Sequence, residues 1–270
     1  MPDEIQWEAE RVRLERVYAW RDTTGVDALA WSWLRPEVHW LDFTIQRFLC
    51  SALAHQGWTP QLAAQRRLLE VGCGTGQVLR WMYDAGLRQL WGCEVLQRRA
   101  REAATITPFA RIVQADMGRL PFPTGFFDCA AQVVAFSSCL DERLRQHAAR
   151  EILRVLKDDG FLLWCDLKPG RTAVEYVRGL GRRDLLRLFP DTTIEVRSFG
   201  VNPQWLGALT SLLNQGLPRS LARRVPGLRD HAWAARRPTT KFPQVAAALL
   251  ERCPGATTYL GAVIRKMPTR

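Results

Sequence analysis

A glycine-rich turn carries the first residues whose types and spacing could do chemistry. It reads Glu70-Val71-Gly72-Cys73-Gly74-Thr75-Gly76, with a carboxylate two residues before three glycines at alternate positions. Glycines at a turn let the backbone approach a ligand closely, because no Cβ stands in the way. We therefore expect a nucleotide-like ligand here. Cys73 is interpreted as a turn residue, and a nucleophilic or redox thiol at this position is the alternative.

The spacing of the turn excludes two common nucleotide sites. A dinucleotide site needs Gly-x-Gly-x-x-Gly, and its third glycine would fall on Gln77 or Leu79, depending on the starting glycine. A phosphate-binding P-loop needs Gly-Lys-Ser/Thr, which this turn does not contain. No basic residue in the turn is placed to meet a pyrophosphate.

The elements that must position this turn alternate between two patterns. Short apolar runs bounded by Gly, Asp or Pro predict strands at 68–71, 90–95, 111–115, 130–136 and 161–167. Apolar residues three and four apart predict helices at 77–85, 97–104 and 141–157. A further helix is expected at 173–188, with strands at 192–199 and 257–264. This order predicts an α/β fold with a doubly wound sheet, whose ligands lie at the carboxyl ends of the strands.

The two flanks of this region differ from it. Residues 1–65 hold six of the eleven tryptophans and predict an N-terminal helical cap. Such a cap packs on the sheet, and one of its helices could also form the apolar wall of a substrate pocket. Residues 66–270 are predicted to form the ligand-binding domain, with a basic helical insertion at about 200–256 before the last strand.

Several sequence blocks together resemble the class I S-adenosylmethionine-dependent methyltransferases. They are the glycine turn, Glu94, Asp116-Met117, the segment LPFPTGFFDCAAQVVAF, and the segment EILRVLKDDGFLLW. The resemblance is closest to the ubiquinone- and menaquinone-type methylases and to secondary-metabolite methyltransferases. It implies a Rossmann-like seven-stranded sheet, mostly parallel, with an antiparallel last strand.

The resemblance also implies a cofactor and its site. S-Adenosylmethionine would be bound, S-adenosylhomocysteine released, and no metal needed. Glu94 would hold the ribose hydroxyls, Asp116 and Met117 the adenine, and the glycine turn the methionine carboxylate and ribose region, with Glu70 near the cationic end. The implied cofactor-binding residues are Glu70, Gly72, Cys73, Gly74, Gly76, Glu94, Val95, Asp116, Met117, Gln132 and Val133.

The acceptor side is less fully specified. Many relatives carry a histidine after the fourth strand, where this chain has Phe136-Ser137-Ser138. Asp166 and His39 are therefore the candidate bases, and each also has a structural interpretation, as a turn cap or as a packing residue. Ser137, Ser138 and Trp33 are candidate substrate contacts. The expected reaction is methylation, most often at oxygen, of a small apolar or aromatic metabolite.

Charge leaves other partners open. The net charge is +11, and residues 171–241 hold 13 Lys/Arg against 5 Asp/Glu. This segment could contact a membrane or another acidic surface, so a membrane-bound lipid or quinone precursor is the second candidate substrate. Solvated arginines explain the charge equally well. Nucleic acid is the less favoured substrate, because Gln132-Val133-Val134-Ala135 is not the motif of amino-group base methylases, and a non-catalytic binder is the remaining class.

Cysteines and the N-terminus bear on the compartment. Seven cysteines with no Cys-x-x-Cys pair and no Cys/His cluster at zinc spacing predict neither a disulfide scaffold nor a structural metal site. The acidic start, MPDEIQWEAE, does not resemble a signal peptide. We expect a cytoplasmic protein, and the sequence leaves its oligomeric state open.

Overall fold

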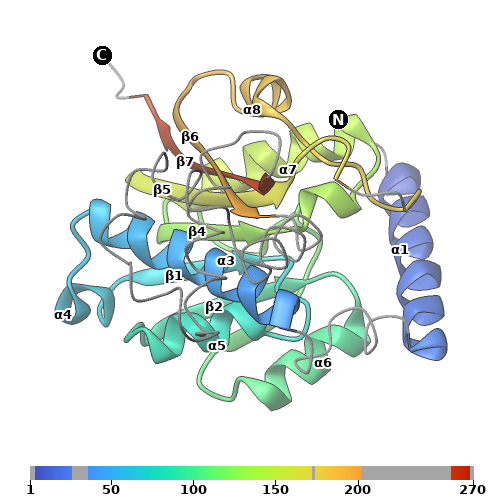
Figure 1. Ribbon diagram of the computed structural model, residues 1–270, viewed down its shortest axis with the longest axis horizontal. Helices are drawn as coiled ribbons and strands as arrows, with labels where there is room; N and C mark the ends of the chain where they lie inside the picture. Colours follow the sequence, from blue (N-terminus) through green and yellow to red (C-terminus); the bar gives the residue numbers. More distant parts are fainter. Residues whose placement is uncertain (1–3, 26–35, 172–173, 202–256, 268–270) are drawn as a thin grey trace, which may run out of the picture.

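A seven-stranded sheet forms the centre of the molecule (Figure 1). The computed structural model describes residues 4–25, 36–171, 174–201 and 257–267. The strands are β1 (Arg67–Val71), β2 (Gln89–Glu94), β3 (Arg111–Gln114), β4 (Phe127–Val133), β5 (Leu156–Leu167), β6 (Thr192–Val201) and β7 (Thr257–Lys266). Their order is β3-β2-β1-β4-β5-β7-β6, and β7 runs antiparallel to both of its neighbours. The predicted α/β, Rossmann-like sheet with an antiparallel last strand is confirmed.

Helices cover both faces of this sheet. The helices of the described residues are α1 (Glu4–Thr24), α3 (Pro36–His55), α4 (Pro60–Ala63), α5 (Gln77–Asp84), α6 (Gln97–Ile106), α7 (Glu142–Val155) and α8 (Arg182–Leu188), and all of them but α1 lie against the sheet or its edges (Figure 1). Alternate strand residues point to opposite faces. Leu68 of β1 thus belongs to the core cluster that contains residues of α3 and α5, and Leu69 belongs to the cluster of α7 and α8. Apolar residues fill both faces because both are covered.

The fourth strand ends earlier than the sequence predicted. β4 stops at Val133 rather than at the expected residue 136, and residues 136–138 form a 3₁₀ turn. Val134 has a φ of 55°, a conformation that a β-branched residue rarely adopts. Its N–H donates to the carbonyl of Cys165 at 2.8 Å, which fixes this turn against the end of β5.

The helix expected at 173–188 was predicted too long. In the structure α8 begins only at Arg182. A Cβ on Gly179 would lie 2.3 Å from the Lys168 carbonyl oxygen, so the chain passes too close to the strand for a helix. The Leu180 N–H instead donates to the carbonyl of Leu167 at 2.8 Å. The segment before α8 is therefore an extended cover over the end of β5.

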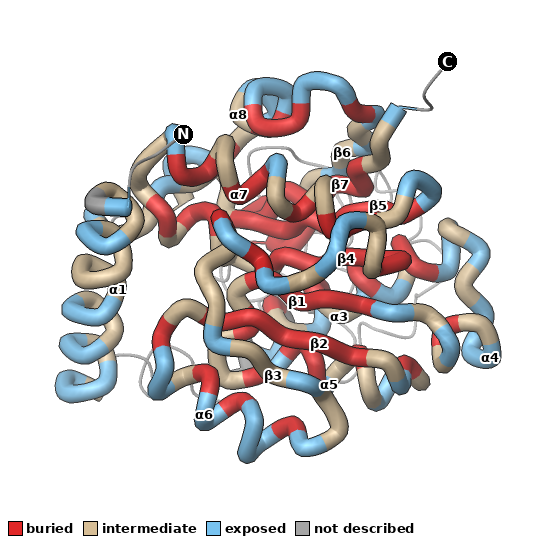
Figure 2. The backbone as a smooth tube through the Cα atoms, turned by 180° about the vertical axis from the view of Figure 1, so that it is seen from behind, coloured by how far each residue is buried: buried red, intermediate tan, exposed pale blue. Residues whose placement is uncertain are grey.

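The two long N-terminal helices have different positions. α3 packs on β5 and β6, where Phe48 stacks on Phe199 with ring centroids 4.7 Å apart. α1 stands apart from the sheet faces (Figure 1), and none of its described side chains is buried (Figure 2). The predicted cap is therefore divided between a packed helix and an outer one. Its proposed boundary at residue 65 stays a prediction, and most of the basic insertion at about 200–256 lies outside the described residues.

Candidate functional site

A cavity of about 650 Å³ lies at the carboxyl ends of the central strands. The order of the strands reverses between β1 and β4. From β1 the chain continues to β2 and β3 on one side, and from β4 it continues to β5 on the other side. Ligands of open α/β sheets bind at such a point. The cavity wall includes the glycine turn and the residues that follow β2, β3 and β4, together with one side of α1.

The glycine turn adopts a backbone that needs its glycines. Gly72, Gly74 and Gly76 have φ values of 72°, 53° and 91°. A Cβ on Gly72 would lie 2.6 Å from the Ala135 Cβ, and one on Gly76 would lie 2.7 Å from the Thr107 Cγ2. A Cβ on Gly74 meets only Arg99, at 3.7 Å. Gly72 and Gly76 thus allow the turn to pack against Ala135 and Thr107, and Gly74 leaves the cavity side of the turn open.

Glu70 places a buried carboxylate at this turn. Its side chain lines the cavity although the residue is only 2 % exposed. Burial, and secondarily the charge of Glu94, raise the pKa of Glu70 well above its usual range, opposed by a backbone hydrogen bond from Leu79. The Oε2 atom is buried without a hydrogen-bond partner among the described residues. A buried acceptor of this kind is costly unless a ligand donates to it.

Glu94 is held by backbone donors on both oxygens. The Gly74 N–H donates to Oε2 at 2.9 Å and the Leu96 N–H to Oε1 at 3.0 Å. Burial raises the pKa of Glu94, while these backbone hydrogen bonds and the charge of Arg99 lower it. Because each carboxylate oxygen can accept two hydrogen bonds, both oxygens retain capacity for a diol. The residue also fixes the glycine turn in place.

Asp116 lines the cavity after the end of β3. Its Oδ1 accepts a hydrogen bond from the Gly118 N–H at 2.7 Å. Burial raises the pKa of Asp116 to about 6, with a smaller contribution from the charge of Glu10. Met117 and Val95 also line the cavity there. The structure thus brings a carboxylate acceptor and apolar side chains together at this part of the cavity wall.

Two implied cofactor residues lie behind the cavity wall. Gly76 and Gln132 are not among the lining residues, whereas the other nine are: Glu70, Gly72, Cys73, Gly74, Glu94, Val95, Asp116, Met117 and Val133. The Gln132 side chain is fully buried and donates from Nε2 to Asp166 Oδ2 at 2.8 Å. Cys73 is buried, and burial raises its thiol pKa far above the ordinary value. A protonated thiol fits the turn interpretation better than a nucleophile.

The two candidate bases do not line the cavity. Asp166 is fully buried beneath it and accepts hydrogen bonds from Gln132, from the Ser137 N–H at 3.0 Å and from the Leu167 N–H at 2.8 Å. These contacts give Asp166 a positioning role at the turn after β4. His39 is exposed on α3. Neither residue is thus among those that line the cavity, and both assignments as bases stay predictions.

The predicted substrate contacts are also separated. Ser138 lines the cavity, Ser137 is fully buried behind it, and Trp33 lies outside the described residues. Among the residues that the structure describes, no group of three or more His, Cys, Asp or Glu side chains is arranged to hold a metal ion. Within the same ranges no helix is both long and apolar enough to cross a bilayer.

Comparison with known proteins agrees with this geometry. Residues 69–164 match the profile of a family described as "Methyltransferase domain". These residues form a class I methyltransferase domain. The [4+2]-cyclase SpnF has the same fold, with a TM-score of 0.52 and 22% sequence identity over 83% of this chain and 81% of that one.

Two curated relatives align with part of the methyltransferase domain. The phthiotriol/phenolphthiotriol dimycocerosates methyltransferase 1 of Mycobacterium ulcerans is 32% identical over 131 residues, 46% of this chain and 45% of that protein. The malonyl-[acyl-carrier protein] O-methyltransferase of Legionella pneumophila is 33% identical over 114 residues, 39% and 38% of the two chains. The chain thus spans less than half the length of either relative that it matches.

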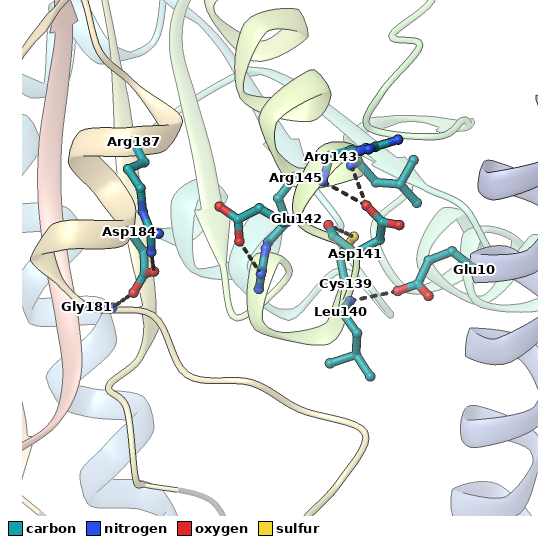
Figure 3. Close-up of polar contacts among 11 residues, drawn as sticks. Glu10, Cys139, Leu140, Asp141, Glu142, Arg143, Arg145, Gly181, Asp184 and Arg187 are labelled. Carbon is teal, nitrogen blue, oxygen red and sulfur yellow. Dashed lines mark hydrogen bonds and ion pairs between the residues drawn. The ribbon is translucent and has the colours of Figure 1, made fainter. Parts of the chain in front are cut away.

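Helix α1 forms one side of the cavity of the methyltransferase domain. The sequence indicated a pocket wall only as the alternative role of the N-terminal cap. Glu10 of α1 accepts a hydrogen bond from the Leu140 N–H at 2.9 Å (Figure 3), and Arg13 donates to the Ser138 carbonyl. Trp7 packs edge-to-face on His147 with ring centroids 6.1 Å apart. The high tryptophan content of this segment was the available signal.

Proposed function

We propose that this chain transfers a methyl group from S-adenosylmethionine to a small apolar or aromatic metabolite, most often at oxygen. The observation that carries the proposal is the Glu70 Oε2, a buried carboxylate oxygen at the cavity with no partner among the described residues. A cationic ligand with N–H donors would satisfy this atom. The methionine end of S-adenosylmethionine has that chemistry.

The residues present fit the rest of this cofactor. Glu94 retains acceptor capacity on both oxygens for the two ribose hydroxyls. Asp116 would accept from the adenine amino group, with Met117 beside the ring. Gly74 permits close approach, because a Cβ there would point into the space beside Arg99. When bound, the cofactor supplies a methyl group already activated by the positive charge on sulfur.

The protein's contribution to the reaction is alignment. Val133 and Val134 line the cavity after β4, and the hydrogen bond from Val134 to Cys165 holds that turn in its unusual conformation. Asp166 fixes the same turn from below through Ser137. A rigid wall that presents an acceptor in line with the donor can supply ~7 to 11 kcal/mol of the barrier.

The acceptor side supports an apolar substrate. Leu14, Leu167, Val174 and Val177 line this part of the cavity together with Val134. Apolar walls with a few polar groups are typical of small-molecule sites. The relative from Mycobacterium ulcerans is named for a dimycocerosate lipid, which favours a lipid-like or quinone precursor at a membrane as the second candidate.

The fold by itself does not decide the reaction, since the similar SpnF structure is that of a cyclase. The test has two stages. Calorimetry with S-adenosylmethionine and S-adenosylhomocysteine measures cofactor binding. Methyl-labelled S-adenosylmethionine with cell extract then measures transfer, with the label separated by solvent extraction and nuclease treatment. Label in low-mass, solvent-extractable material is expected. Binding without transfer would identify a non-catalytic or cyclase-like protein, and nuclease-sensitive label a nucleic-acid enzyme.

A further inference from the structure

Val134 has a backbone conformation that its side chain disfavours. Its φ of 55° lies in the left-handed region, and among the residues that the structure describes it is the only one other than glycine with a positive φ. A branched Cβ crowds the backbone there, so glycine or asparagine would adopt this conformation more easily. Strained residues of this kind cluster at functional sites, where the surrounding structure holds them in place.

Hydrogen bonds hold the turn after β4 in this conformation from several sides. The Val134 N–H donates to the Cys165 carbonyl at 2.8 Å, and the Val134 carbonyl accepts from the Ser138 hydroxyl at 3.4 Å. The Ser137 N–H donates to the buried carboxylate of Asp166 at 3.0 Å. The backbone therefore keeps its path whichever side chain stands at position 134.

Val134 lies between the glycine turn and the apolar acceptor side of the cavity. The next residue, Ala135, packs against the glycine turn, since a Cβ on Gly72 would lie 2.6 Å from the Ala135 Cβ. On the other side, Cys165, which accepts the Val134 N–H, precedes the apolar lining residue Leu167 by two positions. Val134 itself lines the cavity. A group placed between the donor and the apolar acceptor side thus lies next to position 134.

Packing explains this valine only in part. The residue lies between β4 and the 3₁₀ turn, outside any regular element, and it is only partly buried. The apolar area that its side chain removes from water is correspondingly small. Because glycine would adopt the same conformation without strain, the isopropyl group carries a conformational cost that the backbone does not require. The cavity, which Val134 lines, is its other neighbour.

We propose that Val134 is a specificity-determining residue whose isopropyl group limits the width of the acceptor beside the methyl donor. The inference rests on the proposed function, since it assigns a residue to the acceptor side of the same cavity. In a hydrophobic pocket, one methyl or methylene group changes the discrimination between two ligands about 10-fold or more. Val134 thus selects acceptors that are narrow at the reacting atom over wider ones.

The first measurement tests the strain by comparing glycine and alanine at two neighbouring valines. Alanine keeps the Cβ and its strain, whereas glycine removes both. Val134→Gly should therefore have a folded-to-unfolded ratio about 3-fold or more above that of Val134→Ala in denaturant unfolding. Val133, which also lines the cavity but has no positive φ, is the matched control, and there alanine should be the more stable substitution. Greater stability of the alanine variant at both positions would overturn the proposal.

The second measurement tests the acceptor space with two isomers of equal apolar area. The second ring of 1-naphthol lies beside the hydroxyl group, whereas that of 2-naphthol points away from it. Protein saturated with S-adenosylhomocysteine is titrated with each by calorimetry, and 2-naphthol should bind about 10-fold or more tightly. Val134→Ala and Val134→Gly should both reduce that ratio to about 2 or less. Val196→Ala, at a partly buried valine outside the cavity wall, is the matched control and should preserve it.

The two measurements together separate an acceptor role from a structural one. The two Val134 variants are expected to differ in stability and to agree in their loss of selectivity, which a purely structural role would not produce. An unchanged ratio in both variants, an equal change in Val196→Ala, or absence of saturable naphthol binding by the unaltered protein would overturn the proposal. S-Adenosylhomocysteine affinity is measured first in each variant and should be unchanged. Lack of cofactor binding by the unaltered protein would instead contradict the proposed function, and titrations without cofactor then test Val134 separately.

Discussion

Gly118 lies directly beneath the indole ring of Trp7, so that a Cβ on Gly118 would come within 2.0 Å of the ring. The packing of α1 therefore requires a glycine at position 118, more than a hundred residues after Trp7 in the sequence. Gly118 also donates its N–H to Asp116, which connects the helix contact to the cavity.

Gly118→Ala should release α1 from the cavity. The added methyl group cannot fit under the indole, and the contacts that would remain to hold α1 are polar ones, such as those of Glu10 and Arg13, since no described side chain of the helix is buried. Hydrogen exchange of residues 4–24 should become faster while the sheet keeps its protection. Trp7→Ala is the matched variant, since it removes the same contact without a clash. Unchanged exchange of α1 in both variants would contradict this account.

Glu94→Gln should weaken cofactor binding and loosen the glycine turn. The change removes the charge from hydrogen bonds to the ribose, at a cost of about 1.5 to 3 kcal/mol in binding, and it replaces one side-chain oxygen, which accepts from a backbone N–H, by an amide donor. Calorimetry with S-adenosylhomocysteine and thermal unfolding measure the two effects. Glu102→Gln, an exposed change on α6, should alter neither. Wild-type affinity in Glu94→Gln would refute the ribose assignment.

Substitutions at Gly74, Gly76 and Gly125, which all have positive φ, should separate binding from folding. Gly76→Ala should lower stability, because its Cβ meets Thr107 at 2.7 Å. Gly74→Ala should chiefly lower cofactor affinity, because its Cβ enters the cavity, and Gly74→Val should abolish binding. Gly125→Ala, also at positive φ but with open space around the Cβ, reports the backbone cost alone, about 1 kcal/mol. Normal binding by folded Gly74→Val would refute the role of this turn.

Cofactor affinity should fall in mild acid. Asp116, with a pKa of about 6, accepts hydrogen bonds best when ionised, so affinity should be constant above about pH 7 and decrease below pH 6. Folding responds in the opposite sense: because the folded pKa is raised, the stability linked to protonated Asp116 is present at low pH and is lost as the pH rises through about 6. Asp116→Asn should remove the change in cofactor affinity that is centred near pH 6, and any pH dependence due to Glu94 should remain. An identical profile in both proteins would exclude Asp116 as its source.

Asp166→Asn should act on stability rather than on proton transfer. Asparagine keeps one acceptor oxygen, but its amide NH₂ faces an N–H group that now donates a hydrogen bond to Asp166. The loss of this hydrogen bond costs about 1 to 3 kcal/mol in the free energy of unfolding. Denaturant unfolding measures this loss. Once a substrate is known, the pH dependence of kcat should keep its shape in the variant. A stable variant whose kcat falls 100-fold with loss of the acid limb would restore Asp166 as the base.

The sequence predicted the sheet well because its strands are apolar runs ended by turn residues. It also selected three carboxylates that the structure brings to the cavity wall, since Glu70, Glu94 and Asp116 each lie within two residues of the carboxyl end of a strand, and their role toward the cofactor stays a prediction. It could not tell which residues at a strand end face the ligand, because a shift of one residue reverses the side. Val133 lines the cavity and its neighbour Gln132 does not.

Long-range contacts were the other limit. The hydrogen bond between Glu10 and Leu140 joins residues 130 positions apart, and no local pattern in either segment indicates it. The start of α8 was missed for a similar reason, because the close approach of Gly179 to Lys168 depends on tertiary packing. Periodicity reports which face of an element is buried, but not against what.

Because strand order reverses between β1 and β4, the two walls of the cavity come from different stretches of the sequence. Residues 70–117 supply the wall proposed for the donor, whereas residues 7–21, 134–139, 167 and 174–177 contribute to the wall proposed for the acceptor. The two walls belong to separate stretches of sequence, so a gene can accumulate changes in one while the other stays intact. New acceptor preferences are thus accessible to directed evolution through libraries confined to the second group of segments, with donor affinity as the constant readout.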